Sequence, residues 1–338
     1  MLLRSAKYFI LSLFSLSGLL SCSKYLEESD HMALINEAGA LLYLSKVAEA
    51  ANLLNQVDTT QLDDREKALF LLGKGFCSHL NGANEPASVY VHRAQHALMK
   101  HGYDADQAEG FLVNGLILES VEWNVAASKH FQKALDLLRD QADTDAYFYA
   151  LLGAMRTSRD GAKFIGEANT CLERNRNKEK QASLLTSRAM LSTDPAEKLA
   201  LYLLAYEYYD EHSPLMSRIG NLTRIATTYQ ATGEMDSAFA YLDRLKSLIR
   251  ANGSDVNHLL KYHLLKAQFE NSRKNQEAAL TSLAYIFEHS PVGSNMAGNA
   301  YQLRAAIYYE LGDFEAAHTD LQQHTAFVIK ANEESLRL

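Results

Sequence analysis

The stretch GLILESVEWNVAASKHFQKAL, residues 115–135, decides the fold through its pattern of side-chain sizes. Gly115 opens a run of large aliphatic residues, a turn follows, and Ala127 and Ala134 then flank the aromatic Phe131. Small side chains at helical spacing let two helix backbones approach closely, and the large side chains beside them fill the space between neighbouring pairs. The stretch therefore predicts a helical hairpin.

The same pattern recurs along the chain and resembles the tetratricopeptide repeat, whose standard unit has about 34 residues. In this alignment Lys274 takes the turn position that Gly233 and Gly312 hold in other units. Equivalent positions predict eight units that begin near His31, Ala68, Ala108, Asp145, Gln181, Ile219, Leu260 and Gly298. The resemblance implies an all-α, right-handed superhelical solenoid over residues 31–338, ending in a capping helix. No stretch alternates with period two, so no strand is expected.

The beginning of the chain resembles a bacterial lipoprotein signal peptide. A basic start is followed by an apolar run from Tyr8 to Leu20 that rises only ~20 Å as a helix, too short for a ~30 Å hydrocarbon core. Leu19-Leu20-Ser21-Cys22 then matches the lipobox. The resemblance implies a signal peptide over residues 1–21, cleavage before an acylated Cys22, and a tether over residues 22–30. An ordinary signal peptide with a chance cysteine is the alternative.

The residues after Cys22 indicate which membrane holds the protein. Lys24 and the acidic pair Glu27 and Glu28 partly resemble the surface-export signal of Bacteroidota lipoproteins. We therefore expect a lipid-anchored protein of the cell envelope, held at the outer membrane. The side of that membrane, periplasmic or surface, stays open.

Charge and residue types argue against a nucleic-acid partner, a metal site and an enzymatic activity. The formal net charge of −8 opposes unspecific binding to nucleic acid, which needs basic patches, so no nucleic-acid partner is expected. Cys77 and Cys171 fall in different repeats and are expected to be buried small apolar residues. His92 and His96 stand four residues apart, but Arg93 occupies the place of the glutamate that a zinc-protease motif requires. The sequence predicts no metal, no cofactor and no enzymatic activity.

The resemblance to tetratricopeptide arrays also implies a binding groove, because the first helices of successive hairpins line the concave face in that family. The family's groove positions correspond to mixed and mostly polar residues of this chain, which suits an extended peptide or a partner helix. These positions are Glu109, Leu112, Leu116, Glu119, Thr223, Thr227, Gln230, Lys261, Gln268, Asn271, Gln302 and Tyr309.

The predicted function is a membrane-anchored scaffold that binds another envelope protein or a peptide segment in this groove. Three alternatives remain open. A glycan-binding lipoprotein of the polysaccharide-utilisation type is disfavoured by the single tryptophan and the short loops. An α/α-toroid glycosidase would be expected to contain several tryptophans. A third alternative is the sensor part of a tetratricopeptide signalling protein.

Overall fold

A computed structural model describes residues 30–43, 46–80, 84–120, 123–141, 144–174, 177–210, 213, 215–253, 256–290 and 295–335. The predicted signal peptide and Cys22 lie outside these residues, as does all of the predicted tether except Asp30. The described part of the chain is entirely helical and contains no strand. This confirms the all-α fold class that the repeat pattern predicts.

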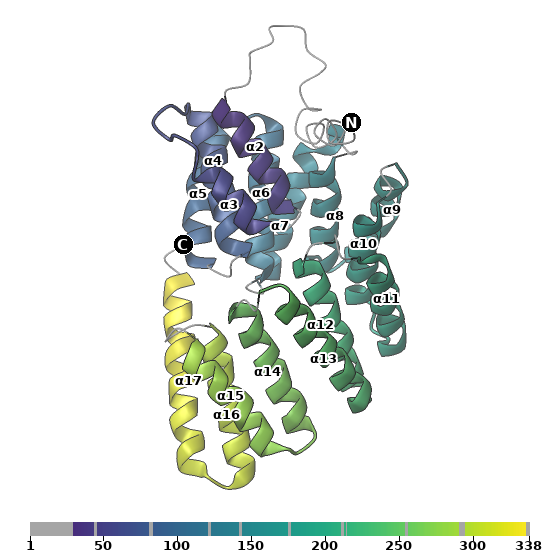
Figure 1. Cartoon of the computed structure of the whole chain (residues 1–338). Helices are drawn as coiled ribbons and strands as arrows, with labels where there is room; N and C mark the ends of the chain where they lie inside the picture. The colour runs from purple at the N-terminus through teal and green to yellow at the C-terminus, as the bar shows by residue number, and fades with distance from the viewer. Residues whose placement is uncertain are drawn as a thin grey trace, which may run out of the picture. The chain divides into compact units, whose positions relative to one another are not determined.

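Sixteen α-helices follow one another in the described ranges and form eight hairpins, which confirms the predicted repeat (Figure 1). Each predicted unit begins within the first five residues of the first helix of a hairpin, called here an A helix. The A helices are α2 (Asp30–Tyr43), α4 (Asp64–Leu80), α6 (Asp104–Ser120), α8 (Asp145–Thr157), α10 (Lys178–Leu191), α12 (Leu215–Ala231), α14 (Val256–Ser272) and α16 (Asn295–Leu311). Their partners, the B helices, are α3 (Val47–Leu54), α5 (Asn84–His101), α7 (Asn124–Leu137), α9 (Ile165–Arg174), α11 (Pro195–Tyr208), α13 (Met235–Ala251), α15 (Gln276–His289) and α17 (Phe314–Ser335). Short 3-10 helices at Arg139–Gln141 and Gly161–Phe164 flank α8.

The chain divides into two compact units, unit 1 (Met1–Arg218) and unit 2 (Ile219–Leu338). Composition gives no sign of this division. In unit 1 the core includes Phe131, Phe148 and Met155, each at most 1% exposed. In unit 2 the core of the last two hairpins includes Leu283 and Ile307, both fully buried. Each unit therefore has apolar packing of its own.

Phe131 shows how side-chain size sets the packing between hairpins. It lies on α7 and is completely buried. A Cβ atom added to Gly115 on α6 would lie 2.7 Å from its ring, and one added to Gly153 on α8 would lie 2.4 Å from it. Only glycine leaves room for the ring at these two points, because real Cβ contacts are longer. Phe131 thus packs α7 against both neighbouring A helices.

In unit 2, the turns between A and B helices follow one hydrogen-bonding scheme. Gly233, Lys274 and Gly312 all adopt positive φ angles of 83°, 62° and 82°. The amide after each of them donates to the carbonyl five residues earlier, over 2.9–3.0 Å. This is the Schellman motif, which ends a helix through a left-handed residue. The alignment of Lys274 with the two glycines is therefore confirmed, and Lys274 is a lysine in a conformation that favours glycine.

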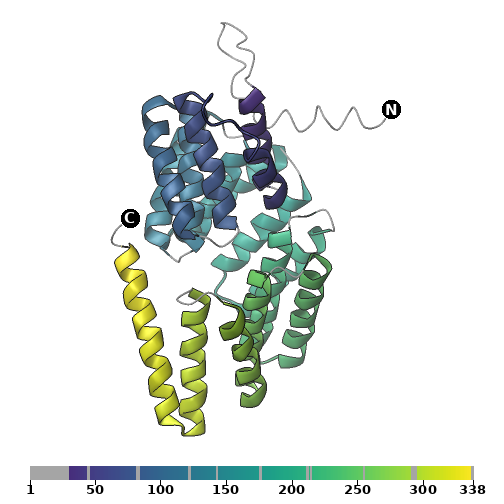
Figure 2. The ribbon, with the colours of Figure 1, turned by 60° about the vertical axis from the view of Figure 1, so that its left-hand side comes forward.

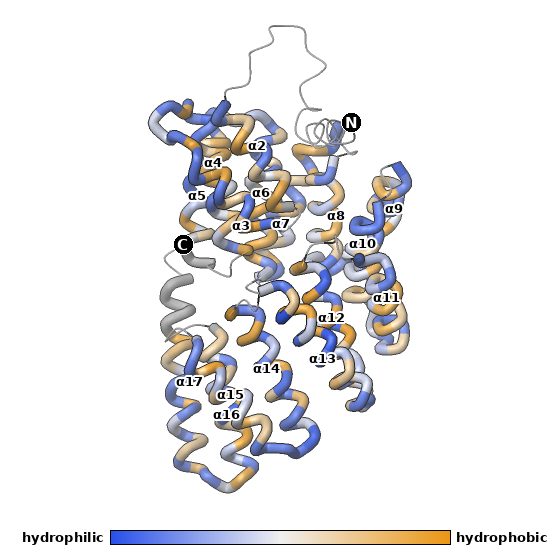
Figure 3. Tube along the Cα trace, in the orientation of Figure 1, coloured by the Kyte–Doolittle hydropathy of each residue, from blue (hydrophilic) through white to orange (hydrophobic). Residues whose placement is uncertain are grey.

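Both internal cysteines are free and buried, as predicted. Hydrophobic and hydrophilic residues are interspersed along the helices in Figure 3. Among the described residues, accordingly, there is no helix with the length and apolarity that a bilayer crossing requires.

The segment predicted as a capping helix is the later part of α17, the B helix of the last hairpin. α17 continues without a break to Ser335 and lies beside α16 (Figure 2). Arg304 of α16 and Asp320 of α17 form a bidentate ion pair of 2.7 and 2.8 Å, and Asp320 is only 3% exposed. The outer side of α17 still presents Leu321 and Ile329, which are about half exposed.

Candidate functional site

In unit 1, packing occupies part of the predicted groove. Leu112 on α6 is completely buried in the core, so its assignment to a groove is corrected. Leu116 is half-buried and packs against the core on both sides. Glu109 is half-buried as well. Leu112 follows the repeat spacing, but its aliphatic side chain is more stable in the core than in solvent.

Ion pairs connect successive A helices in unit 1, and one of them involves the predicted groove residue Glu119. Arg65 of α4 donates two hydrogen bonds to Asp106 of α6, at 2.6 and 3.0 Å. Arg156 of α8 donates two to Glu119 of α6, at 2.5 and 2.8 Å, and one to Ser187 of α10, at 3.1 Å. Burial acts to lower the pKa of Arg156, but the charge and hydrogen bonds of Glu119 outweigh it and raise that pKa. Glu119 is therefore engaged within the protein.

A third group of charges lies between α8 and α10. Lys180, only 3% exposed, pairs with Asp145 and lies over the ring of Phe148. Burial and the nearby Asp145 carboxylate raise the pKa of Glu179 to about 7, although Lys180 opposes this. Burial, and then the charges of Glu179 and Asp145, raise the pKa of Tyr149 well above its ordinary value. Glu179 is thus a carboxyl group that titrates near neutral pH.

Sequence reasoning missed these pairs, although the chain contains a signal for them. Arg65 and Asp106 are 41 residues apart, and Glu119 and Arg156 are 37 residues apart. Both separations equal about one repeat. Opposite charges one repeat apart on A helices would therefore have predicted them.

In unit 2, the predicted groove residues share one side of each A helix, because their spacings follow the helical period. Two contacts join neighbouring A helices near this side. Gln230 of α12 donates to Ser272 of α14 at 3.0 Å, and Lys274, just after α14, donates to Glu310 of α16 at 3.0 Å. The exposed members are Lys261, Gln268, Gln302 and Tyr309, and the half-buried ones are Thr223, Thr227, Gln230 and Asn271. The structure therefore places this half of the predicted surface on three linked helices.

Asn271 is the residue of this surface whose side-chain oxygen lacks a hydrogen-bond partner in the described part of the chain. Its Oδ1 atom is buried and has no hydrogen-bond partner within the described residues. A buried acceptor without a partner costs about 1–3 kcal/mol. Gln268 lies one turn earlier on the same side of α14 and is exposed. Because this atom is buried, a ligand can donate a hydrogen bond to it only after the Asn271 side chain turns outward, and such a bond would remove this cost.

Comparisons with known proteins agree on the fold. No protein-family model and no curated protein matches the chain. A crystal structure of a Rap protein complexed with Competence and Sporulation Factor superimposes with a TM-score of 0.67 at 15% identity, covering 91% of this chain and 89% of that one. NprR in complex with its cognate peptide NprX gives 0.61 at 13% identity, covering 94% and 90%. Aspartyl phosphate phosphatase F from Bacillus subtilis gives 0.55 at 14% identity, covering 96% and 89%. At these identities the likeness shows a shared helical-repeat fold.

Proposed function

We propose that the protein is a binding scaffold that holds an extended peptide segment of another protein against the A helices of unit 2. The observation behind this proposal is the unpartnered, buried Oδ1 atom of Asn271 on a surface rich in amide side chains. Gln268 and Gln302 each offer a donor and an acceptor, the two groups that a peptide backbone presents. An extended backbone is therefore the ligand that fits this surface best.

Two structural neighbours support a peptide as the ligand. The Rap protein was solved with Competence and Sporulation Factor, and NprR with its cognate peptide NprX. Both share the helical-repeat fold along nearly the whole chain. A cognate peptide bound to this fold in NprR supports the proposal of a peptide ligand here.

The proposal also includes the location of the protein in the cell. The lipobox at Leu19-Leu20-Ser21-Cys22 predicts a lipid anchor, and the partner would then be another protein of the cell envelope. A Cys22→Ala variant is expected to leave the membrane fraction and to keep its helical content. Sedimentation of that variant with membranes after a carbonate wash would contradict the anchor and leave the peptide-binding surface untouched.

Photo-crosslinking tests the binding surface. A photo-reactive residue is placed at Gln268 or at Gln302 in the full chain, with Ser247, an exposed residue of the B helix α13, as the matched control position. We expect the two A-helix positions to capture the same segment of one protein and Ser247 to capture none of it. An adduct pattern that is the same at all three positions would refute the proposal, and recovery of oligosaccharide without protein would favour the glycan alternative.

Asn271 provides the energetic test with the captured peptide. Asn271→Leu removes the unpartnered acceptor and is expected to weaken peptide binding by about tenfold, because one hydrogen bond to a buried amide is lost. Thermal denaturation of the variant serves as the folding control. Unchanged affinity would show that Asn271 does not contact the peptide.

A further inference from the structure

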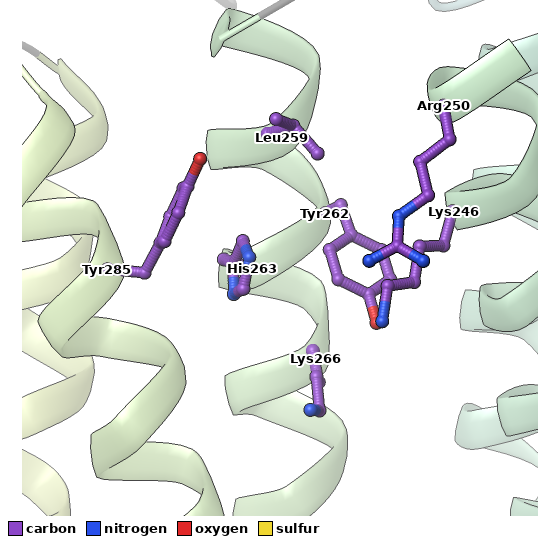
Figure 4. Close-up of a pocket in the computed structure, with 7 residues that line it drawn as sticks. All are labelled: Lys246, Arg250, Leu259, Tyr262, His263, Lys266 and Tyr285. Atoms are coloured by element: carbon purple, nitrogen blue, oxygen red, sulfur yellow. The ribbon is translucent and has the colours of Figure 1, made fainter. Parts of the chain in front are cut away.

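Unit 2 contains a cavity of about 450 Å³ that the predicted groove does not include. Figure 4 shows α14 at its centre, Tyr285 of α15 on one side, and Lys246 and Arg250 of α13 on the other. The wall residues from α14 are Leu259, Tyr262, His263 and Lys266. They lie on a different side of α14 from Lys261, Gln268 and Asn271, because the two sets are about half a turn apart. The cavity therefore opens toward the B helices.

Positive charge dominates the lining of this cavity. Lys246, Arg250 and Lys266 line it together, and no carboxylate is among the lining residues. In the part of the chain that the structure describes, none of the three forms an ion pair. Asp243 lies near enough to raise the pKa of Tyr262, after burial, but it is not part of the wall. Three unpaired cations converge here in a protein whose net charge is −8.

Aromatic rings form much of the remaining wall of the cavity. The rings of His263 and Tyr285 stack at 4.0 Å, and Tyr285 stacks in turn on His289 at 4.0 Å. The ammonium group of Lys246 lies 5.6 Å from the centre of the Tyr262 ring. Such stacks are rigid and apolar on their faces, so they suit the hydrocarbon part of a ligand. The cavity thus combines an apolar wall with an electropositive rim.

The protonation state of His263 decides whether this side chain adds to the positive charge of the cavity. Burial lowers its pKa to about 4, with further contributions from Lys266, Lys246 and His289. The imidazole is therefore neutral at physiological pH. The charge that a ligand meets comes from the two lysines and the arginine.

We propose that this cavity binds a small organic dianion, either a phosphate monoester or a dicarboxylate, that carries an apolar group. A dianion neutralises most of the unpaired charge, which a neutral ligand leaves uncompensated. Arginine and lysine bind both kinds of oxyanion through charge-assisted hydrogen bonds. The apolar group of the ligand would lie against Leu259 and the tyrosine rings.

Calorimetry on the full chain tests this proposal with four probes: phenyl phosphate, phthalate, inorganic phosphate and neutral benzyl alcohol. We expect one or both ring-bearing dianions to bind more tightly than inorganic phosphate, and benzyl alcohol to bind least. Phenyl phosphate alone would identify the ligand class as phosphate monoesters, and phthalate alone would identify dicarboxylates. Binding should weaken with added salt, because the cations lie near the surface.

Charge-removing variants locate the binding to the cavity. Lys246→Gln, Arg250→Gln and Lys266→Gln keep most of each side-chain stem, and each should weaken binding about three- to tenfold. Arg244→Gln is the matched control, because Arg244 is exposed on the same helix, lies over the ring of Tyr241 and does not line the cavity. Circular dichroism confirms that each variant is folded.

Three results would overturn the proposal. No heat of binding from either ring-bearing dianion would show that the cavity does not take such ligands. Equal binding of benzyl alcohol would show that charge plays no part. An equal loss of affinity in Arg244→Gln would place the binding elsewhere. None of these results bears on the peptide surface, which lies on another side of α14.

Discussion

Replacing Glu179 by glutamine is expected to stabilise unit 1 at pH 8 and to stabilise it much less at pH 5. Glu179 is half-buried beside Asp145 and Lys180, and its pKa in the folded protein is about 7, against an ordinary value of 4.5. The folded state therefore holds a proton on this carboxyl group that the unfolded state has already released. Its contribution to stability is full below pH 4.5 and is lost as the pH rises through 7.

The magnitude follows from the two pKa values. Each pKa unit corresponds to about 1.4 kcal/mol, so a carboxyl group that can ionise makes unit 1 less stable than a permanently neutral group would, by about 3 kcal/mol at pH 8 and by about 1 kcal/mol at pH 5. At pH 5 the difference arises because the group ionises in the unfolded state. Solvent at the exposed edge of the group lowers both values, so the gain at pH 8 is about 1–3 kcal/mol. Glutamine has the shape of the protonated acid and keeps an acceptor for the hydroxyl group of Tyr149.

Trp123 provides the assay, because it is the single tryptophan of the chain and belongs to unit 1. Urea titrations followed by its fluorescence give the free energy of unfolding of wild type and Glu179→Gln at pH 5 and pH 8. Groups common to both proteins cancel in the difference. Glu173→Gln, an exposed glutamate on α9, is the matched control and should stay within about 0.5 kcal/mol of wild type.

Two results would refute this reasoning. A difference between Glu179→Gln and wild type that is the same at both pH values would show that the carboxyl group does not titrate between them. An equal pH-dependent gain in Glu173→Gln would assign the effect to net charge rather than to the cluster around Lys180.

Three further substitutions test the packing. Phe131→Ala should destabilise unit 1 by about 3–5 kcal/mol, because it empties the space between Gly115 and Gly153; a loss below about 1 kcal/mol in the fluorescence titration would contradict this packing. Asp320→Asn leaves the Arg304 guanidinium without its counter-charge and should lower the free energy of unfolding of unit 2 by about 2–3 kcal/mol. Hydrogen exchange of the α16 and α17 amides should become faster. Unchanged exchange would show that the ion pair contributes little to stability. Lys274→Gly removes the backbone strain of a lysine in the left-handed conformation and should raise the stability of unit 2 by about 1 kcal/mol. Amide exchange in α14 and α15 should become slower. Faster exchange would mean that the ion pair with Glu310 stabilises the protein by more than the strain destabilises it.

Much of the fold follows from local pattern. Small residues at helical spacing predict the hairpins, because two helices approach closely only where side chains are small. The same alignment places Lys274 with Gly233 and Gly312, and all three prove to be left-handed. These features depend on residues close together in the chain, which is why the pattern of sizes predicts them.

The candidate surface was predicted less completely. The repeat spacing assigned Leu112 and Gln268 to the same kind of position, yet Leu112 is buried and Gln268 is exposed. Spacing defines the side of a helix, but the neighbouring hairpins decide how much of that side is covered. Glu119 matched a groove position, and only the structure shows that Arg156 occupies its carboxylate.

The sequence by itself determined the helical hairpins, their number and their turns, because these depend on contacts within one repeat or between adjacent ones. Tertiary structure alone decided which charges pair and which stay free. Arg156 of α8 forms an ion pair with Glu119 of α6. In contrast, Lys246 and Arg250 of α13 and Lys266 of α14 line one cavity that has no carboxylate among the described residues of its wall. Electrostatic interactions depend on distance and burial in space, and residue spacing along the chain specifies neither of them.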